Sequence, residues 1–147
     1  MQRFRVAILV ALFAHFSWAT HAEQLVRAVG CIGLTVSDFD RSVRFYEAAL
    51  GPLGFRLESH DPKAGSAGFG PSGAPALWIG KGRSPGPLHL AFRAKDQAAV
   101  RRFHEAALGA GGKDNGAPGP RENYAPNYYA AFVLDPDGNN IEAVCLT

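Results

Sequence analysis

The chain has 147 residues, of which 47% are apolar and 19% are charged, and its formal net charge is +2. This composition is typical of one globular domain with a hydrophobic core, and it excludes an intrinsically disordered chain. The sequence contains no long basic run, so it offers no footprint for nucleic acid or for an anionic membrane surface.

The N-terminal segment differs in composition from the rest of the chain. Arg3 and Arg5 precede an apolar run over 6–14, and small residues follow at the spacing of a cleavage site. This pattern predicts a secretory signal peptide over residues 1–22. The apolar run is shorter than the roughly 20 residues that a membrane span needs. We therefore expect a cleaved, periplasmic or secreted protein over residues 23–147, without a stable membrane span.

An oxidising compartment would allow Cys31 and Cys145 to form a disulfide. Two cysteines are too few for a disulfide scaffold, and both lie in apolar runs where cysteine often serves as a small hydrophobic residue. Both interpretations stay open.

The strongest pattern along the chain is an internal repeat. The run 44–51 recurs as 102–109 with a single difference, and the same offset relates Cys31 to His89. Each copy predicts a short strand, a helix and then three more strands. The order βαβββ therefore occurs twice.

In the first copy the helix follows Ser37 and Asp40, a capping-box pattern that predicts Ser37 as the N-cap. Gly51 ends this helix. Gly and Pro separate the strands that follow. The strands of the first copy are predicted at about 31–36, 55–60, 67–70 and 75–81.

In the second copy the helix ends at Gly109, and the run 135–138, Asp-Pro-Asp-Gly, predicts the turn between the last two strands. Module one then covers about 27–82 and module two about 87–147. Two similar modules normally pack about a pseudo-twofold axis, because equivalent apolar faces bury each other. The strands of the second copy are predicted at about 89–94, 113–117, 128–134 and 140–146.

Glu142 is the residue that a structural role explains least well. Strand alternation places it on one face with Val144 and Leu146. An ionised carboxylate on an apolar face is costly unless it is paired or binds a cation. Glu142 therefore meets solvent or an arginine near the C-terminus, or it binds a metal.

His89 points away from Leu88, Leu90 and Phe92, the apolar face of its strand. Its repeat partner Cys31 points away from the apolar residues of its own strand in the same manner. A lone strand histidine is more often hydrogen-bonded or exposed than metal-bound. Both side chains are nevertheless metal ligands in other proteins.

Three runs, 31–46, 87–92 and 135–142, resemble the glyoxalase, bleomycin-resistance and extradiol dioxygenase proteins, collectively the vicinal oxygen chelate superfamily. The resemblance covers nearly everything from about residue 27 to the end, and the last run is its most specific part. It implies an α+β fold of two tandem βαβββ modules with pseudo-twofold symmetry. These modules would form a curved, barrel-like mixed sheet around a cavity.

The first strand of each module in that superfamily supplies a histidine to a divalent metal, and the final strand supplies a glutamate. By position, the resemblance implies Cys31, His89 and Glu142 as metal ligands, with Glu142 also catalytic. A substrate with two neighbouring oxygens would chelate the metal, whose Lewis acidity supports lyase, isomerase or oxygenase chemistry.

The chain departs from the family pattern at several positions. Cys31 stands where the family usually has histidine, which favours zinc among the divalent ions and disfavours extradiol dioxygenase activity. Glyoxalase-type relatives use a further glutamate where this chain has Trp78 and Ile79. Thiol-transferring resistance proteins carry a tyrosine where this chain has Phe132. The resemblance therefore does not directly assign any of these three activities to this chain.

Aromatic residues near the expected cavity suggest a pocket for a small organic molecule. We expect Trp78, Tyr124, Tyr128 and Phe132 to bind the substrate, with Arg121 available for an anionic substituent. His104 receives no functional role.

Two functions stay open. One is a metal-dependent enzyme that acts on a small oxygenated molecule. The other is a metal-free ligand-binding protein similar to the bleomycin-sequestering members of the superfamily, with a redox role for Cys31 as a weaker third alternative. The resemblance also implies a homodimer, because many small members complete their cavity with a partner subunit.

Overall fold

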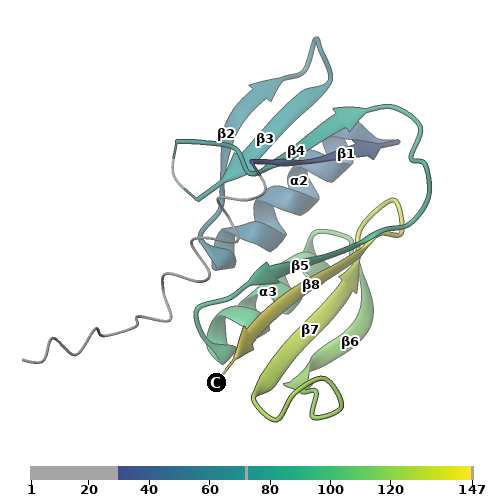
Figure 1. Cartoon of the computed structure of the whole chain (residues 1–147). Coiled ribbons are helices and arrows are strands. Elements are labelled where there is room, and N and C mark those ends of the chain that lie inside the picture. Colours follow the sequence, from purple (N-terminus) through teal and green to yellow (C-terminus); the bar gives the residue numbers. More distant parts are fainter. Residues whose placement is uncertain (1–29, 72, 147) are drawn as a thin grey trace, which may run out of the picture. The chain divides into compact units, whose positions relative to one another are not determined.

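The computed structural model describes residues 30–71 and 73–146. The folded unit begins at Cys31 (Figure 1), and the predicted signal peptide over 1–22 lies outside the described residues. None of the described helices is long and apolar enough to cross a membrane.

Two copies of one βαβββ series build this unit. Each copy forms a four-stranded mixed sheet, in the orders β1-β4-β3-β2 and β5-β8-β7-β6, and in both the first pair of strands is parallel. The predicted α+β class and the tandem modules are confirmed. The first copy contains β1 (Ile32–Val36), α2 (Phe39–Leu50), the 3-10 turn η1 (Gly51–Leu53), β2 (Arg56–Asp61), β3 (Ser66–Gly70) and β4 (Leu77–Lys81). The second contains β5 (His89–Arg93), α3 (Gln97–Gly109), β6 (Lys113–Pro120), β7 (Tyr128–Leu134) and β8 (Asn140–Leu146).

The two sheets do not close into the barrel-like sheet that the resemblance implied. Over the described part of the chain, β1 pairs only with β4 and β5 only with β8, so both are edge strands (Figure 1). The modules meet through α2 and α3, which are in contact, and through one hydrophobic core that contains residues of both modules. The modules are therefore joined through their helices and core, and the described strands form two separate sheets.

Both helices begin at an aspartate. The side chains of Asp38 and Asp96 each accept a hydrogen bond from the backbone N–H three residues on, at 3.1 and 2.7 Å. The expectation that Ser37 is the first N-cap is therefore wrong by one residue. The backbone N–H of Ser37 instead donates to the carboxylate of Asp137. The repeat itself, which aligns Asp38 with Asp96, identifies the true caps.

A buried turn between β7 and β8 ties the second sheet to the first module. Asp135 is only 4% exposed and accepts hydrogen bonds from the Tyr46 hydroxyl at 2.6 Å and the Asn139 amide at 2.8 Å. It also accepts from the backbone N–H groups of Asp137 and Asn139. Asp137 adds a second link, because its carboxylate accepts from the backbone of Ser37 at 3.1 Å.

Tyr46 holds the other end of this network from inside α2. Its side chain is fully buried, and burial together with the negative charge of Asp135 raises the pKa of the Tyr46 phenol far above its usual range. The hydroxyl therefore stays protonated and remains a donor to Asp135.

We predict that Tyr46→Phe lowers the free energy of unfolding by about 1.5–3 kcal/mol, the usual contribution of a hydrogen bond to a charged group. Urea denaturation measures the change. Tyr124→Phe is the matched control because Tyr124 is 60% exposed, and it should change stability by less than about 0.5 kcal/mol. Equal stability of Tyr46→Phe and the wild type would contradict the importance of the Asp135 turn.

The second sheet has two chemically different faces, as strand alternation dictates. One face packs into the main core beneath α3, and the other carries a smaller cluster together with the polar site. The core face presents Leu90, Phe92, Ala131, Val133, Ile141 and Ala143. The opposite face presents His89, Ala130, Phe132, Glu142 and Val144.

Candidate functional site

A buried carboxylate lies at the centre of the open face of the second sheet. Glu142 is only 2% exposed, and both of its oxygens accept hydrogen bonds. His89 Nε2 donates to Oε2 at 2.8 Å, and the Tyr128 hydroxyl donates to Oε1 at 2.6 Å. The sequence left solvent, an arginine or a metal as partners, and the structure instead pairs Glu142 with His89 and Tyr128.

Strand register explains this meeting. β5 and β8 are parallel, with His89 opposite Asn140 and Ala91 opposite Glu142, so His89 and Glu142 are diagonal neighbours on one face. Half of the His89 side chain, 53%, remains exposed. The pair therefore joins a buried carboxylate to an imidazole that solvent or a ligand can reach.

Tyr128 responds to the same carboxylate. Partial burial, followed by its hydrogen bond to Glu142 and the charge of that residue, raises the pKa of Tyr128 to about 12. The phenol is therefore a permanent donor at physiological pH. This hydrogen bond fixes the orientation of the Glu142 carboxyl group.

The donor types of the pair suit a divalent metal. Imidazole nitrogen and carboxylate oxygen are ordinary zinc ligands. Within residues 30–71 and 73–146, however, no group of three or more His, Cys, Asp or Glu side chains is arranged to hold a metal. His89 and Glu142 are therefore of the right types for two ligand positions, and a third ligand would have to come from outside the described residues of one chain.

Cys31 is the third predicted ligand, and the structure does not bring it to His89 and Glu142 within one chain. Its thiol is free and exposed, directly before β1. Cys145 is free and buried, and burial raises the pKa of its thiol. The role of Cys31 as a ligand stays a prediction.

Register also identifies the counterpart of Glu142 in the first module. Gly33 of β1 lies opposite Trp78 of β4, as Ala91 of β5 lies opposite Glu142 of β8. Trp78, not Ile79, therefore occupies the position equivalent to Glu142, and the first module has an indole where the second has its carboxylate.

A cavity of about 340 Å³ is lined in part by His89, the exposed member of the His89–Glu142 pair. Four residues that were predicted to bind substrate or metal line it: His89, Arg121, Tyr124 and Phe132. Tyr124 packs edge-on against Tyr128, with 5.3 Å between the ring centroids. Trp78 lies on the first sheet and is not among the lining residues of this cavity.

The remaining lining residues, Asn115, Gly116 and Asn140, escaped the sequence analysis. Two of them lie on β6, whose pairing with β7 is interrupted by register shifts around Gly116. Glycine and proline inside a strand signal such bulges, and the run 113–120, Lys-Asp-Asn-Gly-Ala-Pro-Gly-Pro, contains two glycines and two prolines. This glycine and proline content was the sequence signal that could have predicted an irregular strand at the cavity.

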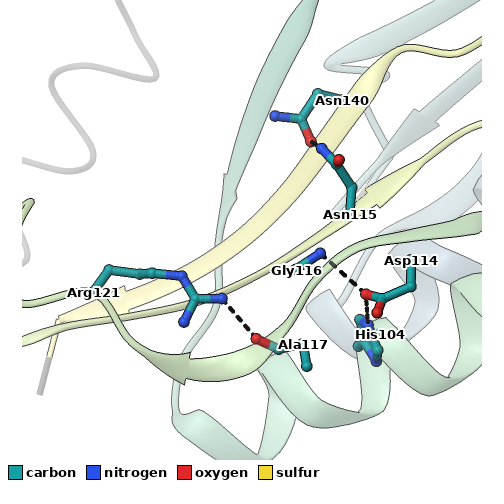
Figure 2. Close-up of polar contacts among 7 residues, drawn as sticks. All are labelled: His104, Asp114, Asn115, Gly116, Ala117, Arg121 and Asn140. Carbon is teal, nitrogen blue, oxygen red and sulfur yellow. Dashed lines mark hydrogen bonds and ion pairs between the residues drawn. The ribbon is translucent and has the colours of Figure 1, made fainter.

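His104 supports the strand that lines the cavity, although no role was predicted for it. Its Nε2 bonds to Asp114 at 2.9 Å, and the same Asp114 oxygen accepts from the backbone of Gly116 (Figure 2). The hydrogen bond from His104 lowers the pKa of Asp114. This contact anchors the irregular strand β6 to α3 at the rim of the cavity.

These observations define a two-module α+β protein with a polar, partly aromatic cavity of small-molecule size on the open face of its second sheet. The chain belongs to the Glyoxalase/Bleomycin resistance protein/Dioxygenase superfamily, whose family model matches residues 27–143. The resemblance drawn from the sequence is thereby confirmed.

Solved structures agree with this assignment. A glyoxalase/bleomycin resistance protein from Albidiferax ferrireducens T118 is 29% identical, with a TM-score of 0.68, and the match covers 78% of this chain and 96% of that one. A glyoxalase I mutant from Zea mays is 28% identical, with a TM-score of 0.58, covering 78% of this chain and 44% of that one. The fosfomycin resistance protein FosX from Mesorhizobium loti shares the fold, with 22% identity and a TM-score of 0.56. The match covers 80% of this chain and 90% of that one. No curated protein matches the chain.

We predict that Tyr128 ionises near pH 12 and that Glu142→Gln lowers this value, because it removes the negative charge beside the phenol. A raised pKa means that the stabilisation is complete below pH about 10, the ordinary value, and is lost as pH rises through about 12. Phenolate absorbance during an alkaline titration measures it, with Tyr128→Phe identifying the signal. An unchanged titration in Glu142→Gln would contradict the Tyr128–Glu142 contact.

Proposed function

We propose that the chain is a small-molecule enzyme in which His89 and Glu142 hold a divalent metal, zinc by preference. The observation that carries this proposal is the buried carboxylate of Glu142 within 2.8 Å of a half-exposed imidazole, at a cavity of about 340 Å³. Burial of a carboxylate on the open face of a sheet costs stability, so a functional reason for it is favoured.

We further propose that a second copy of the chain supplies Cys31 as the third ligand. Three features support a homodimer with a shared site. Cys31 is exposed, β1 and β5 are edge strands, and the described residues of one chain bring only His89 and Glu142 together as possible ligands. Edge strands of this kind readily pair with another chain. A thiolate in the set favours zinc over harder ions.

A metal bound in this way would supply Lewis-acid polarisation of a substrate with neighbouring oxygens. Tyr128 orients the carboxylate through its hydrogen bond to Oε1 of Glu142, and the cavity residues bind the organic part of the substrate. We also propose that the mature protein acts in the periplasm or outside the cell, on the pattern of residues 1–22 alone.

We predict that the wild type binds about one zinc ion per site and that Glu142→Gln weakens zinc binding at least about 100-fold, because an amide is a poor zinc ligand. Competition with a chromophoric chelator measures the affinity. Glu122→Gln is the control, since Glu122 is exposed and outside the cavity. Equal zinc affinity of Glu142→Gln and the wild type would refute the metal site.

A shared site also predicts complementation between two inactive chains. Cys31→Ala and Glu142→Gln should each lose zinc when expressed alone. Co-expression should restore about a quarter of the wild-type zinc content, because half of randomly paired dimers are mixed and each mixed dimer keeps one site without either substitution. No restoration would place the ligands on one chain or exclude Cys31.

The second candidate function is a metal-free ligand-binding protein. It is favoured by the contacts of Glu142, because both carboxylate oxygens already accept hydrogen bonds from His89 and Tyr128. A ligand would then raise the melting temperature of the protein to the same extent with and without a chelator. The metal-dependent proposal expects the chelator to abolish this effect.

A further inference from the structure

We propose that the cavity selects small organic carboxylates and that Arg121 is the residue that binds the carboxylate group. This inference rests on the proposed function in that it takes the cavity beside His89 and Glu142 as the substrate site. It adds the class of substrate, which neither the fold nor the metal determines.

The charge around the cavity favours an anion. Its lining contains the guanidinium of Arg121 and the neutral polar side chains of Asn115 and Asn140, but no carboxylate. Glu142 is buried, and its oxygens are occupied by His89 and Tyr128. Asp114, whose carboxylate accepts from the backbone N–H of the lining residue Gly116, is paired with His104. Over residues 30–71 and 73–146 the ion pairs are those of His89 and His104, so Arg121 has no carboxylate partner there.

The guanidinium of Arg121 is held in place before any ligand binds. It donates to the backbone carbonyl of Pro120 at 3.0 Å. It also donates to the backbone carbonyl of Ala117 at 2.7 Å (Figure 2). It also lies over the ring of Phe132, 5.4 Å from the centroid. These contacts use one N–H of Nη1 and one of Nη2 among the five N–H donors of an arginine, so three donors remain for a carboxylate.

Two glycines make room for this arrangement. A Cβ atom at Gly116 would lie 2.9 Å from the ring of Phe132 and 3.4 Å from Arg121, and one at Gly119 would lie 3.1 Å from Arg121. Bare backbone at these positions lets the guanidinium lie along β6. The irregular strand therefore holds the Arg121 side chain in an ordered position before a ligand binds. Ligand binding then loses less conformational entropy in ordering this side chain.

The other lining groups indicate an organic molecule. Phe132 and Tyr124 present aromatic surface, which a bare inorganic anion would not use. Asn140 accepts a hydrogen bond from Asn115 through its side-chain oxygen at 3.0 Å, which leaves its amide group as a further donor toward a ligand oxygen (Figure 2). A single guanidinium matches one carboxylate in geometry and charge.

Paired probes test this inference on the purified full chain. Benzoate, mandelate and lactate are each titrated by calorimetry against the primary amide of the same skeleton, with inorganic phosphate as a further probe. We expect at least one carboxylate to bind about 10- to 100-fold more tightly than its amide. Arg121→Gln should abolish this preference while leaving the affinity for the amide unchanged.

Arg121→Lys should keep part of the preference, because it retains the charge but not the planar fork. Arg102→Gln, which removes an exposed arginine on α3, is the matched control and should leave the preference intact. An unchanged affinity for the amides shows that each variant is folded.

The inference is overturned if no carboxylate binds better than its amide, if phosphate binds as tightly as the best carboxylate, or if the preference survives in Arg121→Gln. These outcomes are distinct from failure of the metal proposal, which depends on zinc binding by Glu142. Arg121-dependent discrimination without zinc binding would uphold the carboxylate site and leave the metal-free function.

Discussion

The buried carboxylate of Asp135 is the contact on which the position of the site depends. It receives the Tyr46 hydroxyl from α2 and the backbone of the turn that leads into β8. Asn139, held by the same carboxylate, accepts a hydrogen bond from the backbone of Leu88, directly before β5. One turn therefore sets the start of both strands that carry His89 and Glu142 and connects them to the first module.

The site then follows from the two faces of the second sheet. Residues under α3 close the hydrophobic core, and the alternate residues must face the other way. That face can accept Glu142 because His89 and Tyr128 satisfy both carboxylate oxygens. The irregular strand β6 supplies Asn115 and Gly116 to the cavity. The hydrophobic core therefore lies under the helix, and the binding groups lie on the opposite face of the sheet.

The sequence predicts the modules well because both copies of the repeat contain the same pattern of strand and helix signals. The βαβββ order and the special position of Glu142 follow from repeat and alternation. The separation of the two sheets could not be predicted, because the contacts between α2 and α3 and the free edges of β1 and β5 depend on packing between modules. The contribution of β6 was missed for a related reason, since register shifts around Gly116 break the alternation on which sequence prediction relies.

Comparison of equivalent positions explains why only the second module carries the His89–Glu142 pair. The capping aspartates, Asp38 and Asp96, are the same in both copies, and both helices pack into one core. The positions on the open faces differ, with Trp78 where the second module has Glu142. A bulky indole cannot replace a carboxylate as a ligand or hydrogen-bond acceptor. The polar centre therefore belongs to the second sheet, and the first sheet offers an aromatic surface together with the exposed thiol of Cys31. The proposed shared site uses this inequality, because it takes His89 and Glu142 from the second module of one chain and Cys31 from the first module of another.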